Sequence, residues 1–340
     1  MKVIQVGPEG IHLSNYCSSI FPLIGEFGYI GESKCNISGT NSFLVAPFRG
    51  SNIFNWIQSY FKILKYLKNE NPDILHIHQV NRLAFFVCLA AQRFNIPLVT
   101  TAWGSDVLIV PQKSLLHRFI AQYVIKNSLA VTGDSQQMIS IIHQLSPNQS
   151  NLHCIQYGIS PVQSVLKEKI IYSNRLHKPL YRIDLIIELF VEFYSKHKDW
   201  KLVIGAEGEQ TASLKLLAQS LLPESAVEFT GWLNAEQNAS WYSKASIYIT
   251  LPESDGTSVS LLEAMSADCL PIVPDLAVSA EWINSGINGI VYNPKLNPIE
   301  EALKLDADVC RKTNQKLIAE RALKSATTMQ FYAIYKSALK

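Results

Sequence analysis

The chain has 340 residues, of which 48% are hydrophobic and 17% are charged, and its formal net charge is +2. This composition excludes a disordered chain and gives room for two domains, each with its own core. The small net charge excludes a strong general attraction to nucleic acid. Residues 1–160 carry 11 Lys and Arg against seven Asp and Glu. That excess suits an anionic surface or acceptor, but it is also compatible with ordinary scatter.

The cysteines and the hydropathy pattern bear on the compartment. None of the six cysteines forms a CxxC pair, so the sequence predicts buried thiols in a reducing compartment and no zinc ribbon or disulfide framework. The first residues lack the apolar core and the small-residue cleavage site of a signal peptide. No run of about 18 apolar residues occurs. We therefore expect a cytoplasmic protein.

Short apolar runs alternate with amphipathic segments along the first half of the chain. The apolar runs predict strands at residues 3–6, 43–46, 74–77, 98–101 and 130–132, and apolar residues at helical spacing predict helices at 56–68 and 115–125. Nearly all-apolar strands are typical of central strands that are covered on both faces. The alternation predicts an α/β fold with a parallel sheet and right-handed crossovers.

The pattern pauses where Gly158 and Pro161 lie close together, and it resumes near Lys169. The second half predicts strands at 169–172, 201–204, 227–230, 247–250 and 270–273, and helices at 185–196, 211–221, 240–243, 258–265 and 311–339. We therefore predict an N-terminal domain over residues 1–162, a second domain over 168–322, and a closing helical segment over 323–340.

The segment over residues 251–265 carries the most informative motif. It joins an apolar strand to a helix that is predicted to begin near Ser258, and Gly256 lies in the turn between them. Glycine lets a backbone approach a ligand closely, and a helix N-terminus offers unpaired N–H groups that suit a phosphate. Glu263, about one and a half turns into the helix, could accept hydrogen bonds from two ribose hydroxyls. For any single turn of this kind, the alternative is a capped helix with a surface Glu.

The spacing of Asp255 and Glu263, with Ala264 and Met265 after them, resembles the E-x7-E motif of the retaining family 4 glycosyltransferases, also called group 1. This resemblance implies a GT-B fold, in which two Rossmann-like domains face each other across a central cleft and a C-terminal helix crosses back to the N-domain. It implies that Glu263 holds the donor ribose. It also implies that the first acidic residue and the backbone N–H groups after it face the transferred sugar; here these residues are Asp255, Gly256, Thr257 and Ser258. The family's first Glu is replaced by Asp255, which is one methylene shorter.

Further landmarks of a donor domain follow in the order found in the family. Arg175 and Lys178 resemble the cations that neutralise the donor diphosphate, although the family spaces them five residues apart and Arg182 is an alternative to Lys178. For Lys178 the other interpretation is a solvated surface cation. The glycine turn after the second strand and the segment that frames the base are represented by Gly205, Gly231 and Trp232.

The N-terminal domain matches the family more loosely. The glycine-rich turn after the first strand implies an acceptor side with Gly10, His12 and Asn15, to which the resemblance adds His78 and Asp106. The turn from Trp103 to Asp106 resembles the family's H-G-x-D turn, but Trp103 replaces the His that faces the donor sugar. Trp cannot exchange a proton at neutral pH, although its indole can donate one hydrogen bond or stack on a sugar. His78 is the neighbour that could compensate.

His76 and His78 lie two residues apart on a predicted strand, so they share one face and zinc binding is conceivable. No third ligand is in view, so a packed or hydrogen-bonded His is favoured. No acidic pair of the DxD type stands where a metal-bridged diphosphate would need it. We expect no metal and no other cofactor.

The resemblance implies a retaining hexosyltransferase that uses a nucleotide diphosphate-sugar, with UDP favoured over GDP. The sugar would pass to a hydroxyl group of a saccharide or a lipid-linked saccharide. The acceptor would attack on the face from which the nucleotide leaves, with the donor phosphate as base. The implied setting is bacterial O-antigen, capsule or exopolysaccharide assembly. A non-catalytic GT-B scaffold or binding subunit and a GT-B nucleotide-sugar epimerase are the alternatives.

One predicted helix bears on the membrane. Residues 54–68 interleave four aromatic side chains with three lysines: Trp56, Tyr60, Phe61, Tyr66, Lys62, Lys65 and Lys68. This pattern is typical of an interfacial helix on a membrane surface, and also of a packed helix with a solvated lysine edge. It adds a possible peripheral contact with the inner face of the membrane to the expected partners.

Overall fold

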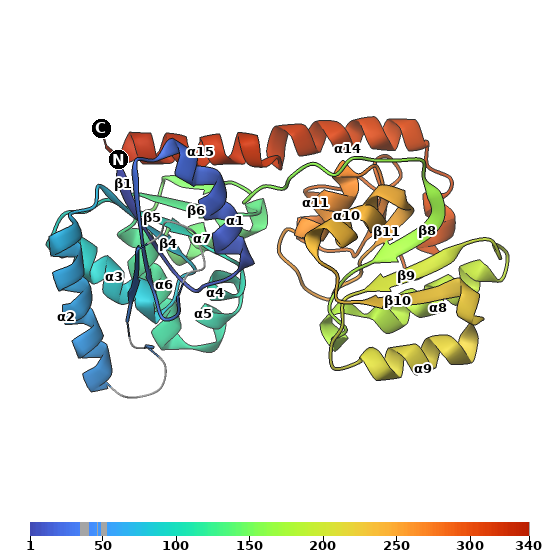
Figure 1. The fold of residues 1–340 in the computed structure, drawn as a ribbon, viewed down its shortest axis with the longest axis horizontal. Helices are drawn as coiled ribbons and strands as arrows, with labels where there is room; N and C mark the ends of the chain where they lie inside the picture. The colour runs from blue at the N-terminus through green and yellow to red at the C-terminus, as the bar shows by residue number, and fades with distance from the viewer. Residues whose placement is uncertain (35–40, 46, 49–52, 340) are drawn as a thin grey trace. The chain divides into compact units, whose positions relative to one another are not determined.

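The computed structural model describes residues 1–340 except residues 35–40, 46, 49–52 and 340. Two compact units divide the chain (Figure 1). Unit 1 consists of Met1–Gly158 together with Lys324–Lys340, and unit 2 consists of Ile159–Leu323. The C-terminal segment therefore belongs to unit 1, and the chain passes between the units twice. The sequence-based boundaries at residues 162 and 323 lie near the two crossing points.

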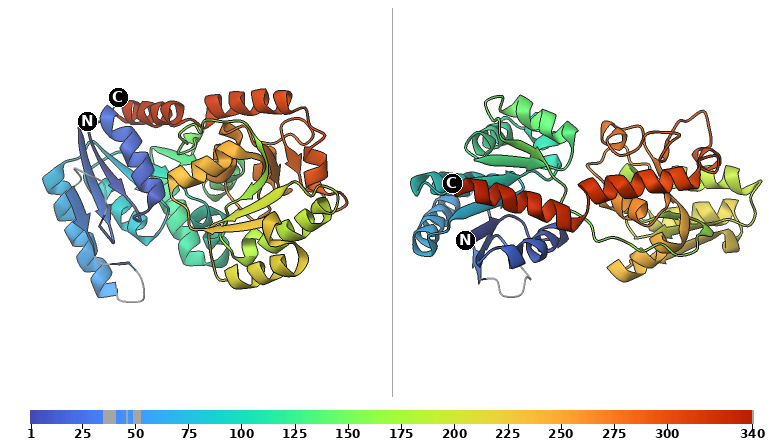
Figure 2. Two further views of the ribbon diagram at one scale, coloured as in Figure 1. Left: turned by 45° about the vertical axis from the view of Figure 1, so that its right-hand side comes forward. Right: turned by 90° about the horizontal axis from the view of Figure 1, so that it is seen from above.

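Unit 1 is built on a parallel sheet whose described strands have the order β3-β2-β1-β4-β5-β6-β7. The strands are β1 (Lys2–Val6), β2 (Glu26–Gly31), β3 (Asn41–Leu44), β4 (Ile74–His78), β5 (Leu98–Thr101), β6 (Ala130–Gly133) and β7 (Leu152–Cys154). The helices are α1 (Ile11–Ile20), α2 (Ile53–Glu70), α3 (Arg82–Arg93), α4 (Ser105–Leu108), α5 (Val110–Lys113), α6 (Leu115–Lys126), α7 (Gln136–Leu145) and α15 (Lys324–Ala338). Helices α1 and α15 pack together on one face of the sheet, and α2, α3, α6 and α7 cover the other (Figures 1 and 2).

Unit 2, which is described throughout, has a parallel sheet in the order β10-β9-β8-β11-β12-β13. The strands are β8 (Glu168–Ser173), β9 (Lys201–Gly205), β10 (Val227–Gly231), β11 (Ala245–Ile249), β12 (Leu270–Val273) and β13 (Ile290–Val291). The helices are α8 (Ile183–Tyr194), α9 (Thr211–Leu221), α10 (Ala235–Lys244), α11 (Val259–Ser266), α12 (Ala277–Ala280), α13 (Pro298–Ala302) and α14 (Ala307–Arg321). Helices α8, α9 and α13 cover one face, and α10, α11 and α14 cover the other. The predicted α/β class with two Rossmann-like units is confirmed.

Helix α8 illustrates how the sequence builds these layers. Ile183, Ile186, Ile187, Phe190 and Phe193 recur at helical spacing, and all five side chains are fully buried against the sheet. Burying one such side chain contributes about 1.5–3 kcal/mol. The amphipathic pattern therefore fixes which face of the helix packs on the sheet.

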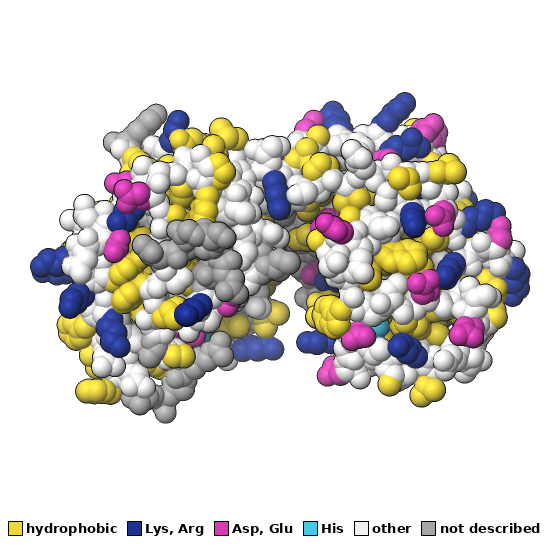
Figure 3. Space-filling view, viewed as in Figure 1, with side chains coloured by type: hydrophobic (Ala, Val, Ile, Leu, Met, Phe, Trp, Pro, Cys, Tyr) yellow, Lys and Arg dark blue, Asp and Glu magenta, His cyan; other side chains and the backbone are white. Residues whose placement is uncertain are grey.

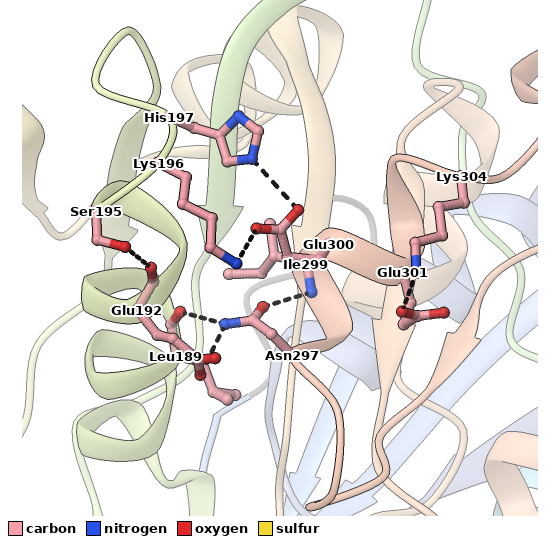
Figure 4. A network of polar contacts seen from close by, with 10 residues as sticks. All are labelled: Leu189, Glu192, Ser195, Lys196, His197, Asn297, Ile299, Glu300, Glu301 and Lys304. Carbon is pink, nitrogen blue, oxygen red and sulfur yellow. Dashed lines mark hydrogen bonds and ion pairs between the residues drawn. The ribbon is translucent and has the colours of Figure 1, made fainter.

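The far end of α8 is fastened to α13 by polar contacts (Figure 4). Asn297 caps α13 through the Ile299 N–H, and its amide donates to the Leu189 carbonyl at 2.9 Å and to Glu192 at 3.2 Å. The Glu300 carboxylate lies 3.5 Å from Lys196 Nζ and 3.3 Å from His197 Nε2. Because these contacts gather toward the C-terminal end of α8, they join that end of the helix to α13 on the same face of the sheet.

The predicted strands are present among the described residues, with ends that differ by at most two positions. Residue 46, the last of the predicted strand 43–46, lies outside the described residues. The sequence missed β2, β7 and β13, because β2 contains two glycines and the other two strands have only three and two residues. None of the described helices is long and apolar enough to cross a lipid bilayer.

The prediction of one helix over residues 311–339 is wrong, because α14 ends at Arg321 and α15 begins at Lys324. The incoming chain causes the break. The Ile159 N–H donates to the Ala322 carbonyl at 2.7 Å, and Ile159 forms a β-bridge with Leu323. The Ala322 carbonyl is thus paired with the incoming chain at the point where α14 has ended and α15 has not begun.

Candidate active site

The carboxyl ends of β8 and β11 meet at the point where the winding of unit 2 reverses. From β8 the chain proceeds to β9 and β10 on one side, whereas β11 leads to β12 and β13 on the other. Ligands in open α/β sheets bind in the crevice outside the strand ends at such a reversal. Ser173 ends β8 with a buried hydroxyl that has no hydrogen-bond partner among the described residues. The predicted donor residues follow these two strands.

Arg175 follows the end of β8 by two residues. Its Nη2 is 2.8 Å from Asp255 Oδ2, and its Nη1 donates to Ser258 Oγ at 2.7 Å. The guanidinium also lies 4.5 Å from the centre of the Tyr181 ring. The structure thus brings together three residues that the sequence assigned separately to the diphosphate and to the transferred sugar. All three are largely buried, which strengthens their electrostatic interaction relative to water.

Asp255 is turned toward its own unit. Its Oδ1 accepts the Gly256 N–H at 3.1 Å, while Oδ2 faces Arg175. Burial raises the pKa of Asp255, and Arg175 and the Gly256 N–H counter this rise only in part. In this state the carboxylate holds Arg175 and the loop, and its predicted contact with a transferred sugar stays a prediction.

The loop from Asp255 to Ser258 leads directly into α11. Ser258 is the N-cap of the helix, and its hydroxyl accepts the Leu261 N–H. Gly256, Thr257 and Ser258 line a small pocket whose other wall runs from Val273 to Trp282. The indole N–H of Trp282 is buried without a hydrogen-bond partner among the described residues. Sequence reasoning missed Trp282, because nothing local links it to the loop.

Glu263 lies on α11, half-buried, and Tyr172 and Tyr242 are close enough to respond to its charge. Lys178 is exposed, and its ammonium group forms no hydrogen bond or ion pair with the described residues. Arg182 instead donates its Nε–H to the Leu251 carbonyl at 2.7 Å, so it supports the segment before the loop. The predicted roles of these three residues toward a donor stay predictions.

The predicted base-framing residues gather at the same edge of the sheet. Gly205 ends β9 and Gly231 ends β10, and Trp232 follows with 66% of its surface exposed. A Cβ at Gly205 would lie 3.1 Å from the Tyr172 hydroxyl, so a larger residue there would crowd β8. An exposed indole beside two glycines offers a flat surface on which a base could stack.

Unit 1 has its own reversal point between β1 and β4, and a cavity of about 460 Å³ lies there. It is lined by Gly7, Pro8, Glu9, Glu32, Ser33, Phe48, Gln79, Asn81, Arg82, Leu83 and His117. Arg82 donates to the Phe48 carbonyl at 3.0 Å and stacks over Trp56 at 5.0 Å. The mixture of carboxylate, amide and guanidinium groups is suited to a polar ligand with several hydroxyls.

The residues predicted for the acceptor do not line this cavity. Gly10 caps α1, and Asn15 is exposed on α1 with its carbonyl taken by Ser18 and Ser19. The side chain of His12 lies outside the described residues. The cavity residues Glu9 and Arg82 were missed, although each follows directly after the strand-end turn of β1 or β4.

His78 belongs to a buried polar network beneath α1 and α15. Its Nδ1 lies 2.9 Å from the Tyr157 hydroxyl and its Nε2 lies 2.7 Å from Gln5 Oε1. His76 has both ring nitrogens similarly engaged, with Tyr335 at 2.6 Å and Thr101 at 2.7 Å. Among the described residues, no group of three His, Cys, Asp or Glu side chains could hold a metal ion. The histidines are therefore packed, hydrogen-bonded core residues.

These histidines predict a loss of stability in mild acid. Burial lowers the pKa of His78 to about 3 and that of His76 well below its usual range. The unfolded state binds protons near pH 6.5 but the folded state does not, so stability is complete above pH 6.5 and falls as the pH drops toward 3. Between pH 6.5 and 5.0 each His is expected to cost about 2 kcal/mol. Urea unfolding at both pH values measures this loss.

The matched variant is His78→Gln, which keeps a polar side chain but does not titrate. Its free energy of unfolding should fall less steeply with pH than that of the unmodified chain. An unchanged slope would show that His78 has the same pKa in the folded and unfolded states.

The turn from Trp103 to Asp106 is held by hydrogen bonds within unit 1. The indole N–H of Trp103 donates to the Tyr157 hydroxyl at 2.5 Å. Asp106 is buried and accepts the N–H groups of Val80 and Gly104 at 2.8 Å and of Trp103 at 3.1 Å. Burial raises the pKa of Asp106, and these N–H groups oppose the rise. Asp106 therefore shapes the turn. The contact of Trp103 with a donor sugar stays a prediction, and so does the contact of Asp106 with an acceptor.

Two family models match the chain. One, described as glycosyl transferases group 1, matches residues 161–318, and the other, described as glycosyl transferase 4-like, matches residues 30–137. The N-acetyl-alpha-D-glucosaminyl L-malate synthase of Bacillus anthracis is 24% identical over 60% of this chain and 57% of its own length, so the match spans less than two thirds of that enzyme.

Solved structures show the same fold. The Anabaena protein HepE in complex with UDP and glucose has a TM-score of 0.78 and 12% identity, over 99% of this chain and all of the other. The lipopolysaccharide outer core galactosyltransferase WaaB has a TM-score of 0.75 and 13% identity, over 99% of both chains. The predicted GT-B architecture is confirmed. The chain therefore combines a glycosyl transferase 4-like region over residues 30–137 with a group 1 glycosyltransferase region over residues 161–318.

Proposed function

We propose that the protein is a retaining, metal-independent hexosyltransferase that moves a sugar from UDP-sugar to a hydroxyl group of a saccharide or lipid-linked saccharide. The observation that carries the proposal is the cluster of Arg175, Asp255 and Ser258 at the reversal point of unit 2. A fixed guanidinium beside a helix N-terminus suits a diphosphate. UDP is preferred because the HepE structure was solved with it.

In the proposed reaction the diphosphate binds Arg175 and the N–H groups of Gly256–Ser258, while Glu263 accepts the ribose hydroxyls. The bond between the anomeric carbon and the phosphate oxygen breaks as the acceptor oxygen bonds to the same face of that carbon. The acceptor proton passes to the departing phosphate. Arg175 stabilises the charge on this leaving group without reorganisation, an effect of about 3 kcal/mol. Retention is tested by the anomeric coupling constant in the NMR spectrum of the product.

The acceptor is proposed to bind the polar cavity of unit 1, which is lined by Glu9, Glu32 and Arg82. Acceptor contacts of the predicted residues Gly10, His12, Asn15, His78 and Asp106, which do not line the cavity, are proposed as well. Bacterial surface-glycan assembly is the proposed setting, which the likeness to WaaB supports. The proposed location is the cytoplasm, with peripheral contact at the inner membrane face.

A thermal-shift panel with UDP, GDP, ADP and CMP, with and without Mg²⁺, tests the donor site. A ligand at 100 times its Kd stabilises the folded state by about 2.7 kcal/mol. We expect UDP to raise the melting temperature without Mg²⁺, and Glu263→Ala to abolish that shift. Glu236→Ala, an exposed Glu on α10 of the same unit, is the matched control and should leave the shift unchanged.

The other outcomes separate the alternatives. If no nucleotide shifts the melting temperature, the donor site does not function and the scaffold hypothesis replaces the enzyme. If UDP binds but solvent deuterium enters the donor sugar without any acceptor, the protein is an epimerase. A shift that requires Mg²⁺ contradicts the metal-independent mechanism.

A further inference from the structure

A row of hydrogen-bonded side chains runs through the core of unit 1. In the order of their contacts, its members are Trp103, Tyr157, His78, Gln5, Tyr335, His76, Thr101 and Thr132. We name these eight residues the polar series. All are buried except Trp103 and Tyr157, which are half-buried, and Figure 3 shows no histidine (cyan) on the coloured part of the unit 1 face that it presents. Because a buried polar group without a partner is costly, each hydrogen in the series should be used.

The direction of the series is set at Trp103, because an indole N–H can donate a hydrogen bond but cannot accept one. It donates to the Tyr157 hydroxyl at 2.5 Å. The Tyr157 oxygen is therefore an acceptor on this side, and its own hydrogen can pass onward to His78 Nδ1 at 2.9 Å. That contact makes Nδ1 the acceptor of a neutral His78 ring, so the hydrogen of the ring lies on Nε2.

Gln5 leads to the same assignment from the other side of His78. Its Nε2–H donates to the Tyr335 hydroxyl at 3.2 Å, so its Oε1, which can only accept, faces His78 Nε2 at 2.7 Å. His78 Nε2 must therefore carry a hydrogen. Burial keeps the ring neutral by lowering the pKa of His78 to about 3, so Nδ1 carries none. The contacts at the two ring nitrogens thus give one and the same tautomer.

The hydrogens around Tyr335 can be counted in the same way. Its hydroxyl lies 2.6 Å from both the Tyr16 hydroxyl and His76 Nδ1, and the Tyr16 hydroxyl lies 3.2 Å from that nitrogen. If His76 Nδ1 carried a hydrogen, one of the three hydrogens in this group would have no acceptor within it. With Nδ1 as the acceptor, Tyr16 donates to Tyr335 and Tyr335 donates to His76. His76 Nε2–H then donates to Thr101 at 2.7 Å, and Thr101 donates to Thr132 at 2.7 Å.

We propose that the polar series is a one-way row of hydrogen bonds that holds the Trp103 indole in place and uses its one donor. Tyr157 and His78 are then positioning residues, and they tie the Trp103 turn to β1, β4 and α15. A histidine at position 103, which the family carries, accepts as well as donates, so Trp103 is what fixes the direction. A consequence, which rests on the proposed function, is that Trp103 meets the donor sugar through the face of its ring and not through its N–H.

Nitrogen-15 NMR of the full chain, labelled at histidine, tests the direction of the series. The measurement needs neither nucleotide nor sugar transfer, so its failure is distinguishable from failure of the proposed enzyme. We expect both His76 and His78 to show the shift pattern of the Nε2–H tautomer at neutral pH. Resonances lost in His76→Gln and in His78→Gln assign the two rings. The Nδ1–H tautomer at either ring, or an averaged mixture of tautomers, would overturn the proposal.

Tyr157→Phe removes the hydroxyl between Trp103 and His78 and keeps the ring. We expect the His78 Nδ1 resonance to move to the position of an acceptor without a donor, and kcat to fall by about fivefold, the effect of one neutral hydrogen bond. Tyr123→Phe is the matched control, because Tyr123 donates to Gln92 at 2.7 Å in the same unit but outside the series. It should change neither quantity. An unmoved Nδ1 resonance or an unchanged kcat in Tyr157→Phe contradicts the positioning role.

Two variants of Trp103 separate its ring from its N–H. Trp103→Phe keeps an aromatic face without the donor, and Trp103→Leu removes both. We expect the affinity for UDP-sugar to stay within about threefold in Trp103→Phe and to fall by about fivefold or more in Trp103→Leu. Titration calorimetry measures both, and the affinity for UDP, which has no sugar to contact, should change in neither. Equal losses of UDP-sugar affinity in the two variants would assign the sugar contact to the N–H and overturn the proposal.

Discussion

Replacing Arg175 with Gln is expected to lower kcat by about 10²–10³-fold, with a smaller change in KM for the donor. The Arg175 guanidinium contacts both Asp255 and Ser258, at 2.8 and 2.7 Å. A preorganised cation of this kind acts mainly on the charge that develops on the leaving phosphate. Arg175→Lys keeps the positive charge but loses the planar, two-pronged hydrogen-bonding geometry. Its kcat should therefore lie between that of the unmodified protein and that of Arg175→Gln. Steady-state kinetics with UDP-sugar measure both constants.

Arg321→Gln is the matched control. Arg321 also stacks on an aromatic ring, Trp282, at 4.1 Å, and donates to the Glu281 carbonyl at 2.7 Å, but it belongs to α14 and not to the loop. Arg321→Gln should keep kcat within a few fold of that of the unmodified protein, provided that both are fully folded under the conditions of the assay. If Arg175→Gln retained full kcat while UDP still bound, the leaving-group role assigned to Arg175 would be wrong.

Gly158→Ala is expected to destabilise unit 1 by about 2–4 kcal/mol. Gly158 has φ +85, and a Cβ at this position would lie 2.4 Å from Thr327 Oγ1 and 2.7 Å from the Lys324 Cα atom. The substitution therefore adds a steric clash with the start of α15 to the cost of a positive φ. Calorimetric unfolding of the full chain measures the change.

Gly286→Ala isolates the clash from the backbone strain. Gly286 has φ +84, almost the same as Gly158, but a Cβ there would meet nothing within 4 Å. It should cost only about 1 kcal/mol, the usual penalty of a positive φ for Ala. Equal losses for the two variants would show that α15 moves aside freely at Gly158.

The donor side of the site could be predicted because its chemistry is local in the sequence. Asp255, Gly256 and Ser258 lie within one turn between a strand and a helix, and that order alone places them at a helix N-terminus. The direct contact of Arg175 with Asp255 could not be predicted, because 80 positions separate them and only the register of β8 beside β11 joins them. The same register explains why Asp255 faces Arg175.

The cavity of unit 1 escaped prediction for a related reason. Glu9, Glu32, Phe48, Arg82 and His117 come from separate segments that meet only when β1 pairs with both β2 and β4. Period-two spacing correctly placed His76 and His78 on one face of β4. It could not indicate their partners, since Tyr335 lies 259 positions after His76. Helical spacing likewise ran through residues 322 and 323, because the interruption comes from Ile159 and not from the local sequence.

The return of α15 to unit 1 fixes an order of events during synthesis on the ribosome. Until Tyr335 is made, Tyr16 and His76 lack a partner at 2.6 Å, and the apolar core that Phe331 and Ile334 complete stays open. Unit 2 is continuous over Ile159–Leu323, so all of its chain is synthesised before α15. Domains usually fold in the order in which they are translated. Here we expect unit 2 to complete its folding first, and unit 1, which needs α15, to complete its folding last.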